Sequence, residues 1–248
     1  MLTVGIDLAA EPPGTAIAAV EWSATAARLR QVVHPADDDA VVAAIQSAGK
    51  AGVDCPLGWP DAFVSFVAGH RAGAVAGVGQ ARDKSWRRGL AWRLTDEVVR
   101  EATGIVPLSV AADRIAHTAM RCAAVQARLA DLGEPVDRSG AGVVVEVYPA
   151  ASLKIWGLPV RGYKGPAGAT VREALVHRLR AVAPWLDLGD LAGLCVRSDH
   201  VLDAVVAALA ARAAAIGVAT RPAPDQLAAA RTEGWIALPA GALDTLLP

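Results

Sequence analysis

Apolar and polar positions in the first quarter of the chain predict a strand-rich beginning. Three short apolar runs with partial alternation follow one another, and turn residues such as Pro12 and Gly14 separate them. Short turns between such runs favour an antiparallel meander. Acidic helix-start signals then precede an apolar stripe, and a fourth short run is stopped by Pro56. The expected elements are strands at 2–9, 15–22, 28–34 and 51–55, with a helix from Asp37 to Gly49 between the last two.

The rest of the chain is expected to be mostly helical. Gly and Arg are frequent over 70–90, which predicts a loop, and the Gly-rich segment 161–168 predicts a mobile loop. The whole pattern is that of a single α/β domain, 1–248, with a helical and loop insertion at about 56–140. Helices are expected at 61–69, 95–103, 110–132, 170–183 and 199–216, and strands at 143–148 and 235–238.

Composition narrows the class of protein. Apolar residues make up 54% of the 248 residues but aromatic residues only 4%, so Ala, Val and Leu must fill the core. The 24 basic and 25 acidic residues give a net charge of −1, which argues against binding nucleic acid through bulk charge. The three cysteines form no CxxC pair, the first residues do not resemble a signal peptide, and no apolar run is long enough for a membrane span. We therefore expect a cytoplasmic protein without a membrane partner.

Acidic residues occur where the sequence otherwise predicts the interior of a sheet. Asp7, Asp54 and Glu146 each interrupt an apolar strand pattern, where an unpaired charge costs several kcal/mol. Asp199 and Asp203 are spaced i, i+4 and so share one face of the predicted helix, which small alanines continue. Converging carboxylates repel one another unless a cation lies among them, and hard oxygen ligands suit Mg²⁺ or Mn²⁺.

Each acid also has a simpler explanation. Asp7 and Asp54 can serve as turn residues at the ends of their strands. Glu146 can pair with a buried arginine, and Asp199 can stabilise a helix start through the macrodipole. Asp203 lies one turn further into the helix, where capping explains it less well. The five acids together favour a shared site more than any one of them does.

Several short motifs occur in order along almost the whole chain. They are Gly5-Ile6-Asp7-Leu8-Ala9, Gly52-Val53-Asp54-Cys55-Pro56-Leu57-Gly58, Arg93-Leu94-Thr95-Asp96, Glu146-Val147-Tyr148-Pro149, Asp199-His200-Val201-Leu202-Asp203-Ala204 and Glu233-Gly234-Trp235-Ile236. Together they resemble the family called domain of unknown function 429, which is similar to predicted nucleases of the ribonuclease-H fold. The resemblance implies a ribonuclease-H-like mixed sheet, with three antiparallel strands followed by parallel ones and flanked by helices.

The same resemblance implies the roles of the acids. The first-strand acid, Asp7, would bind two metal ions, and the last-helix acid, Asp203, would complete one of the two sites. Asp54 and Glu146 would be intermediate ligands. His200, beside the acids, could position water or move a proton near neutral pH, although a solvent-facing histidine explains it as well. The expected catalytic residues are Asp7, Asp54, Glu146, Asp199, His200 and Asp203, and the expected cofactor is Mg²⁺ or Mn²⁺.

Substrate contacts are expected from basic side chains. Residues 82–93 carry five basic residues around Trp86 and Trp92, which is typical of a phosphate-tracking surface with stacking platforms and equally of a solvated face with tryptophans turned inward. Arg93 can contact a phosphate or pair with a neighbouring acid, and Lys164 lies in the Gly-rich loop with Tyr163. The expected substrate-binding residues are Arg93, Asp96 and Lys164.

Several other patterns are weak. The segment from Gly77 to Arg82 lacks the third glycine of a dinucleotide fingerprint. The remaining histidines have no metal-ligand spacing, and Cys55 has no evident partner base, so a small core residue explains it better.

Three functions are compatible with the sequence. The first is a metal-dependent nuclease that hydrolyses phosphodiester bonds in DNA or RNA. The second is a non-catalytic binding or scaffold protein with a vestigial acidic site. The third, a nucleotide-dependent phosphotransferase, is disfavoured because such proteins resemble two copies of this core and the chain is long enough for one.

Overall fold

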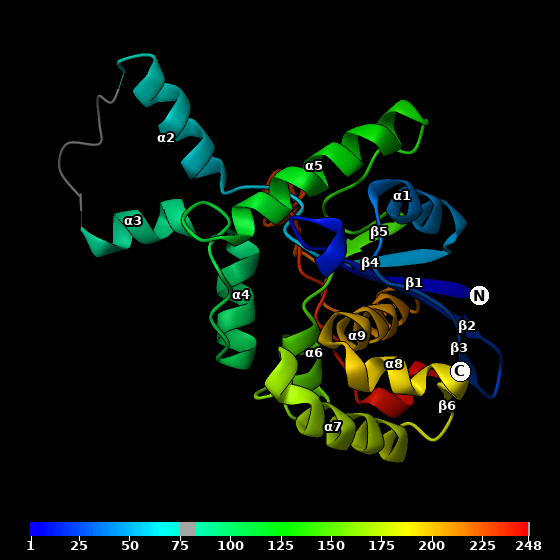
Figure 1. Cartoon of the computed structure of the whole chain (residues 1–248). Coiled ribbons are helices and arrows are strands. Elements are labelled where there is room, and N and C mark those ends of the chain that lie inside the picture. Colours follow the sequence, from blue (N-terminus) through cyan, green and yellow to red (C-terminus); the bar gives the residue numbers. More distant parts are fainter. Residues whose placement is uncertain (75–82, 248) are drawn as a thin grey trace.

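A six-stranded mixed sheet forms the centre of the chain in the computed structural model, which describes residues 1–74 and 83–247 (Figure 1). The order of strands across the sheet is β5-β4-β1-β2-β3-β6. The strands are β1 (Leu2–Asp7), β2 (Ala16–Trp22), β3 (Ala27–Val33), β4 (Lys50–Asp54), β5 (Val144–Glu146) and β6 (Leu186–Asp187).

Along the chain, helices and strands do not alternate one by one, because several helices follow one another between β4 and β5 and after β5. The α-helices are α1 (Asp38–Ser47), α2 (Asp61–Arg71), α3 (Lys84–Ala91), α4 (Leu94–Thr103), α5 (Ile115–Asp131), α6 (Pro149–Ile155), α7 (Ala169–Val182), α8 (Ala192–Arg197), α9 (Asp199–Ala215) and α10 (Leu227–Glu233). The predicted beginning of strand, strand, strand, helix, strand is confirmed, with boundaries within two residues of those expected.

Strand direction changes at β1. β1 pairs with β2, and β2 with β3, in the antiparallel sense, whereas β4 runs parallel to β1 and β5 parallel to β4. The carboxyl ends of β1, β4 and β5 consequently lie at one edge of the sheet. The expected mixed α/β sheet flanked by helices is confirmed.

Two hydrophobic cores lie on opposite faces of the sheet. On one face, Val41 and Ile45 of α1 and Val125 and Leu129 of α5 pack against β1 and β4. On the other face, α9 crosses the sheet, and α6, α7 and α8 cover it from outside (Figure 1). Thirteen of the seventeen residues of α9 are buried, so this helix is central rather than a surface element.

Glycines let α9 approach the sheet closely. A Cβ atom added to Gly5 of β1 would lie 1.9 Å from the carbonyl oxygen of Ala204, and one added to Gly52 of β4 would lie 2.5 Å from that of Ala207. Neither distance is possible between non-bonded atoms, so both positions require glycine. The expected small-residue contact between this helix and the sheet is therefore present, and it brings Asp203 to the ends of β1 and β4.

Several expectations for the less regular parts were wrong. Part of the segment expected to be a loop over 70–90 is the helix α3, whose N-terminus is capped by the side chain of Asp83. The last predicted strand, 235–238, is no strand in the structure and contributes one isolated bridge, between Ile236 and Glu146. The weak motif from Gly77 to Arg82 lies outside the described residues, as does Arg82 of the basic segment.

The segment between β4 and β5 contains α2 to α5. Of these, α5 packs on the sheet, whereas α2 and α3 extend away from the body of the protein (Figure 1). The two projecting helices contact each other through an edge-to-face pair, Phe66 with Trp86. Among the described helices, none combines the length and the apolar character that a membrane crossing requires.

Candidate functional site

Three carboxylates meet at the carboxyl edge of the sheet. Asp7 is the last residue of β1 and Asp54 the last of β4, and the two are direct partners in the parallel register. Asp203 comes from the second turn of α9 and is fully buried. The sheet therefore places two acids side by side, and the close approach of α9 adds the third.

Burial and neighbouring charges raise the pKa values of Asp54 and Asp203. Burial raises the pKa of Asp54 well above its usual range, and the negative charges of Asp7 and Asp203 raise it further. Burial also raises the pKa of Asp203 to about 6, with Lys164 opposing the shift and Asp7 adding to it. The Asp54 carboxylate makes no hydrogen bond or ion pair within the described part of the chain. Among the described residues, Asp54 thus has no direct cationic partner although it lies beside two other carboxylates.

The Gly-rich loop supplies the polar partners of Asp203. The Tyr163 hydroxyl donates a hydrogen bond of 2.9 Å to Asp203, and the Lys164 ammonium forms an ion pair with the same carboxylate. The buried Arg172 holds the loop by donating to the carbonyl oxygens of Tyr163 and Gly165, each at 2.6 Å. The loop, which the sequence predicted to be mobile and to carry the substrate-binding Lys164, is therefore tied to the acidic cluster.

His200 contacts Asp7 directly. Its Nδ1 atom lies 2.7 Å from the Asp7 carboxylate, and this hydrogen bond raises the pKa of the imidazole despite partial burial. The side chain is 39% exposed, so its other nitrogen can reach a bound molecule. The ring also stacks on His34, with centroids 5.8 Å apart. His34 was not predicted to belong to the site, since the two histidines are far apart along the chain.

Asp199 is on the rim of the cluster. Ser198 caps the N-terminus of α9 with its side chain, and Asp199 is the first residue of that helix. Its carboxylate accepts a hydrogen bond of 3.1 Å from the backbone N–H of Gly165. Partial burial opposes the effect, but this hydrogen bond and the nearby positive charges lower the pKa of Asp199. Asp199 therefore anchors the loop at the helix start.

Glu146 belongs to a separate, fully paired network. The Arg93 guanidinium is 2% exposed and donates twice to Glu146, at 2.7 and 2.9 Å, and twice to Asp96, at 2.9 and 3.1 Å. Its fifth N–H reaches the carbonyl oxygen of Glu233, and the backbone N–H of Leu57 donates to Glu146 at 3.0 Å. Of the alternatives open for Glu146 and Arg93, pairing is the one present in this structure. Arg93 has no N–H left for a phosphate.

Glu233 joins the two ends of the segment between β4 and β5. Its carboxylate accepts hydrogen bonds of 2.9 Å from the backbone N–H groups of Asp61 and Leu94, which begin α2 and α4. An acid at a helix N-terminus also stabilises the helix dipole. The Glu233-Gly234 motif therefore has a structural role that its sequence did not specify.

A cavity of about 210 Å³ opens beside the acids. Asp7 and Asp54 line one part of it, and the paired Arg93, Asp96 and Glu146 line another. The apolar part of the wall, which the sequence did not indicate, is formed by Pro107, Leu108 and Ile115 together with Val147, Tyr148 and Ile236. A molecule bound here would meet the carboxylates of Asp7 and Asp54 and an apolar surface.

The basic segment lies away from this cavity, except for Arg93. Arg88 forms an ion pair with Glu97 at 2.6 Å and lies over the ring of Trp92. The indole nitrogen of Trp92 donates to the carbonyl oxygen of Pro107. Trp92 therefore supports the loop that forms the cavity wall. Cys55, buried at 2% exposure, is the small core residue expected from the sequence.

The oxygen ligands at the site fit a hard divalent cation in their chemistry. Three carboxylates, one of them without a partner, are the donors that Mg²⁺ and Mn²⁺ prefer. As placed, no three His, Cys, Asp or Glu side chains in residues 1–74 and 83–247 form a metal-binding group. Instead the Lys164 ammonium supplies the positive charge at Asp203.

Comparison with known proteins identifies one similarity. A family model described as "Protein of unknown function (DUF429)" matches residues 5–227. No curated protein and no solved structure gives a match. The matched region includes the acidic cluster and the Arg93 network.

Proposed function

The chain belongs to the DUF429 family, whose function is unknown, and from its site we propose that it is a divalent-metal-dependent phosphodiesterase acting on nucleic acid. The observation that carries the proposal is the charge deficit at Asp7, Asp54 and Asp203, where burial and mutual repulsion raise the pKa values of Asp54 and Asp203. A carboxylate cluster is costly to stability, and such a cost is typical of a site kept for function.

The proposed ligands are Asp7, Asp54 and Asp203, in a core of the ribonuclease-H-like type. Glu146 is left out because both of its oxygens are paired with Arg93. A bound divalent cation would supply a water of lowered pKa and would neutralise charge on the scissile phosphate. Binding at Asp203 would compete with Lys164 for the same carboxylate.

The remaining side chains have distinct roles in this proposal. His200 carries a proton more readily than an isolated histidine because Asp7 accepts its hydrogen bond, so it can donate a proton to the leaving oxygen. Lys164, half-exposed at the cluster, can contact a phosphate oxygen. Tyr163 fixes the orientation of Asp203, and the apolar wall of Leu108 and Ile115 can receive a base.

One observation favours a second candidate. The ion pair between Lys164 and Asp203 neutralises part of the cluster without a metal ion, as expected of a binding protein with a vestigial acidic site. The two functions differ in whether a cation binds and whether a phosphodiester bond is then broken.

Cleavage of fluorescently labelled DNA and RNA oligonucleotides tests the proposal. We expect cleavage with Mn²⁺ or Mg²⁺ and none with a chelator, and we expect Asp7→Asn to lower the rate at least about 100-fold. Asp187→Asn is the matched control, since Asp187 lies on an edge strand, far from the cluster, and its exposed carboxylate pairs with Arg28 and accepts a hydrogen bond from the backbone N–H of Gly189. Circular dichroism would show that both variants are folded.

The outcomes separate the candidates. Metal-dependent cleavage that is lost in Asp7→Asn but kept in Asp187→Asn supports the phosphodiesterase. Full activity in Asp7→Asn would rule out this site. Cation binding by calorimetry without cleavage of any oligonucleotide would rule out the phosphodiesterase and favour the binding protein.

A further inference from the structure

A second cavity lies at the opposite edge of the sheet from the acids. It has a volume of about 670 Å³ and is lined by the first residue of β4, Lys50, and by Val143, which directly precedes β5. The last residues of α9, Ala214 and Ala215, and the segment that follows this helix complete it. Because Asp54 is at the other end of β4, this cavity is separate from the candidate active site.

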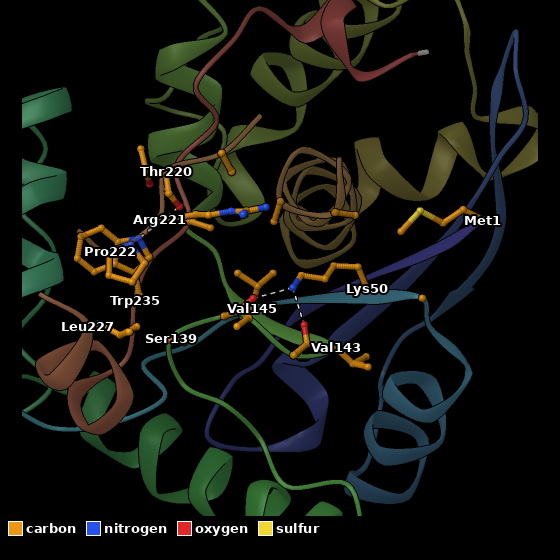
Figure 2. Close-up of a pocket in the computed structure, with 18 residues that line it drawn as sticks. Met1, Lys50, Ser139, Val143, Val145, Thr220, Arg221, Pro222, Leu227 and Trp235 are labelled. Atoms are coloured by element: carbon orange, nitrogen blue, oxygen red, sulfur yellow. Dashed lines mark hydrogen bonds between the residues drawn. The ribbon is translucent and has the colours of Figure 1, made fainter. Parts of the chain in front are cut away.

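Lys50 is a buried cation that forms no ion pair with any acid in residues 1–74 and 83–247. The residue is only 8% exposed. Its ammonium donates hydrogen bonds to the carbonyl oxygens of Gly140, at 2.7 Å, and Gly142, at 2.5 Å (Figure 2). Burial lowers the pKa of Lys50, and the positive charge of Arg221 lowers it further, with Asp137 only partly opposing. Two of the three N–H donors are thus satisfied by neutral oxygens, and the charge itself is not balanced.

Arg221 brings a second positive charge to the same cavity. Figure 2 shows its side chain and that of Lys50 extending toward each other from opposite sides. The guanidinium makes no hydrogen bond or ion pair with any other described residue. Like charges that converge without an acid between them are destabilising, and an anion placed between them would remove this cost.

The rest of the lining is neutral and mostly apolar. None of the described residues that line the cavity is acidic. Val143 is 44% exposed, and Pro222 and Leu227 form a partly exposed wall beside the buried Trp235. A volume of this size is in the range of sites that hold small organic molecules, about 300–1,000 Å³.

From this combination we propose that the cavity binds a small organic anion. Lys50 and Arg221 hold its phosphate or carboxylate group, and Val143, Pro222 and Leu227 contact its apolar part. The proposal does not depend on the function assigned to the acidic cluster.

Phenyl phosphate is a suitable probe, because it joins a phosphate to an apolar ring. Calorimetric titration in the presence of a chelator, so that no cation occupies the acidic cluster, should show binding by the wild-type chain. The uncharged benzyl alcohol should bind at least about tenfold more weakly, as expected when a charge-assisted hydrogen bond is lost.

Variants then locate the binding. Arg221→Gln should weaken phenyl phosphate binding at least about tenfold, and since the Arg221 guanidinium makes no hydrogen bond or ion pair with the described residues, the fold should be unaffected. Arg231→Gln, an exposed arginine of α10 that does not line the cavity, is the matched control. Lys50→Met should weaken binding as well, with thermal unfolding used to check that this buried variant is folded. Lys164→Gln should have no effect, because Lys164 lies at the acidic cluster.

Three results would overturn the proposal. They are failure of the wild-type chain to bind phenyl phosphate at millimolar concentration, equal binding by the wild type and Arg221→Gln, and loss of binding in Lys164→Gln alone.

Discussion

Two groups of acids lie at one cavity, and they differ in what surrounds them. Glu146 and Asp96 share the guanidinium of Arg93, which is bonded through all five of its N–H groups. In the cluster of Asp7, Asp54 and Asp203, the charged partners are His200 and Lys164, both partly exposed, and Asp54 has no partner in the described residues.

This difference shows that an acid in an apolar strand does not by itself indicate whether its role is structural or functional. Glu146 in one group and Asp7 and Asp54 in the other give the same signal in the sequence, namely a carboxylate in an apolar strand. A buried arginine turns one group into a structural ion-pair network, while the lack of one leaves the other as a candidate for cation binding. Three predictions test this contrast between the paired and the unpaired acids.

The largest effect is expected from removing the arginine. Arg93→Met would leave Glu146 and Asp96 buried without a counterion, and we expect a loss of about 3–5 kcal/mol in the free energy of unfolding. Urea denaturation measures this value. The control is Arg100→Met on α4, the helix that Arg93 precedes. The ion pair of Arg100 with Glu97 is partly exposed, so this variant should cost at most about 1 kcal/mol in the free energy of unfolding.

A double variant sharpens the result. Adding Glu146→Gln to Arg93→Met removes one of the unpaired charges and should restore part of the lost stability. If Arg93→Met cost no more than Arg100→Met, the paired network would not have the structural role described here.

Removing the charge of Asp54, which has no partner in the described residues, should raise the free energy of unfolding rather than lower it. Asp54→Asn removes a charge that burial and two neighbouring carboxylates disfavour, so the metal-free protein should gain about 1–3 kcal/mol at pH 8. Asp187→Asn should instead lose a little stability, since its exposed pair with Arg28 is broken. A destabilised Asp54→Asn would show that the cluster is not short of positive charge.

The smallest effect concerns pH. The pKa of Asp203 is about 6 in the folded protein against a usual value of 3.8, so the folded state binds more protons between these values. The contribution of Asp203 to stability is therefore present below about pH 4 and is lost as the pH rises through 6.

A cation that takes the place of this proton should bind more tightly as the pH rises. The affinity for Mn²⁺, measured by calorimetry, should be about tenfold higher at pH 7.5 than at pH 5, because the carboxylate must lose its proton to bind. In Asp203→Asn the change should be smaller. The same slope in both proteins would exclude Asp203 as the group that titrates.

Much of the fold could be predicted from local patterns. The first three strands, α1 and β4 follow from apolar runs and turn residues, and the long helix α9 follows from its alanines. The sequence did not predict the elements whose pattern is obscured or whose formation depends on contacts with distant residues. The helix α3 was missed because glycines and arginines obscure its pattern, and the two residues of β6 form a strand only by pairing with Ala27 and Arg28.

The candidate site, like the fold, could be predicted from the sequence only in part. The sequence by itself determined which acids occupy strand ends and that Asp203 lies on the small-residue face of a helix, because period and residue size are local properties. Only the tertiary structure decided that Arg93 pairs with Glu146, that Lys164 reaches Asp203, and that Lys50 and Arg221 share a cavity. These pairings join residues far apart in the chain, and the role of a buried charge depends on which opposite charge the fold brings within reach.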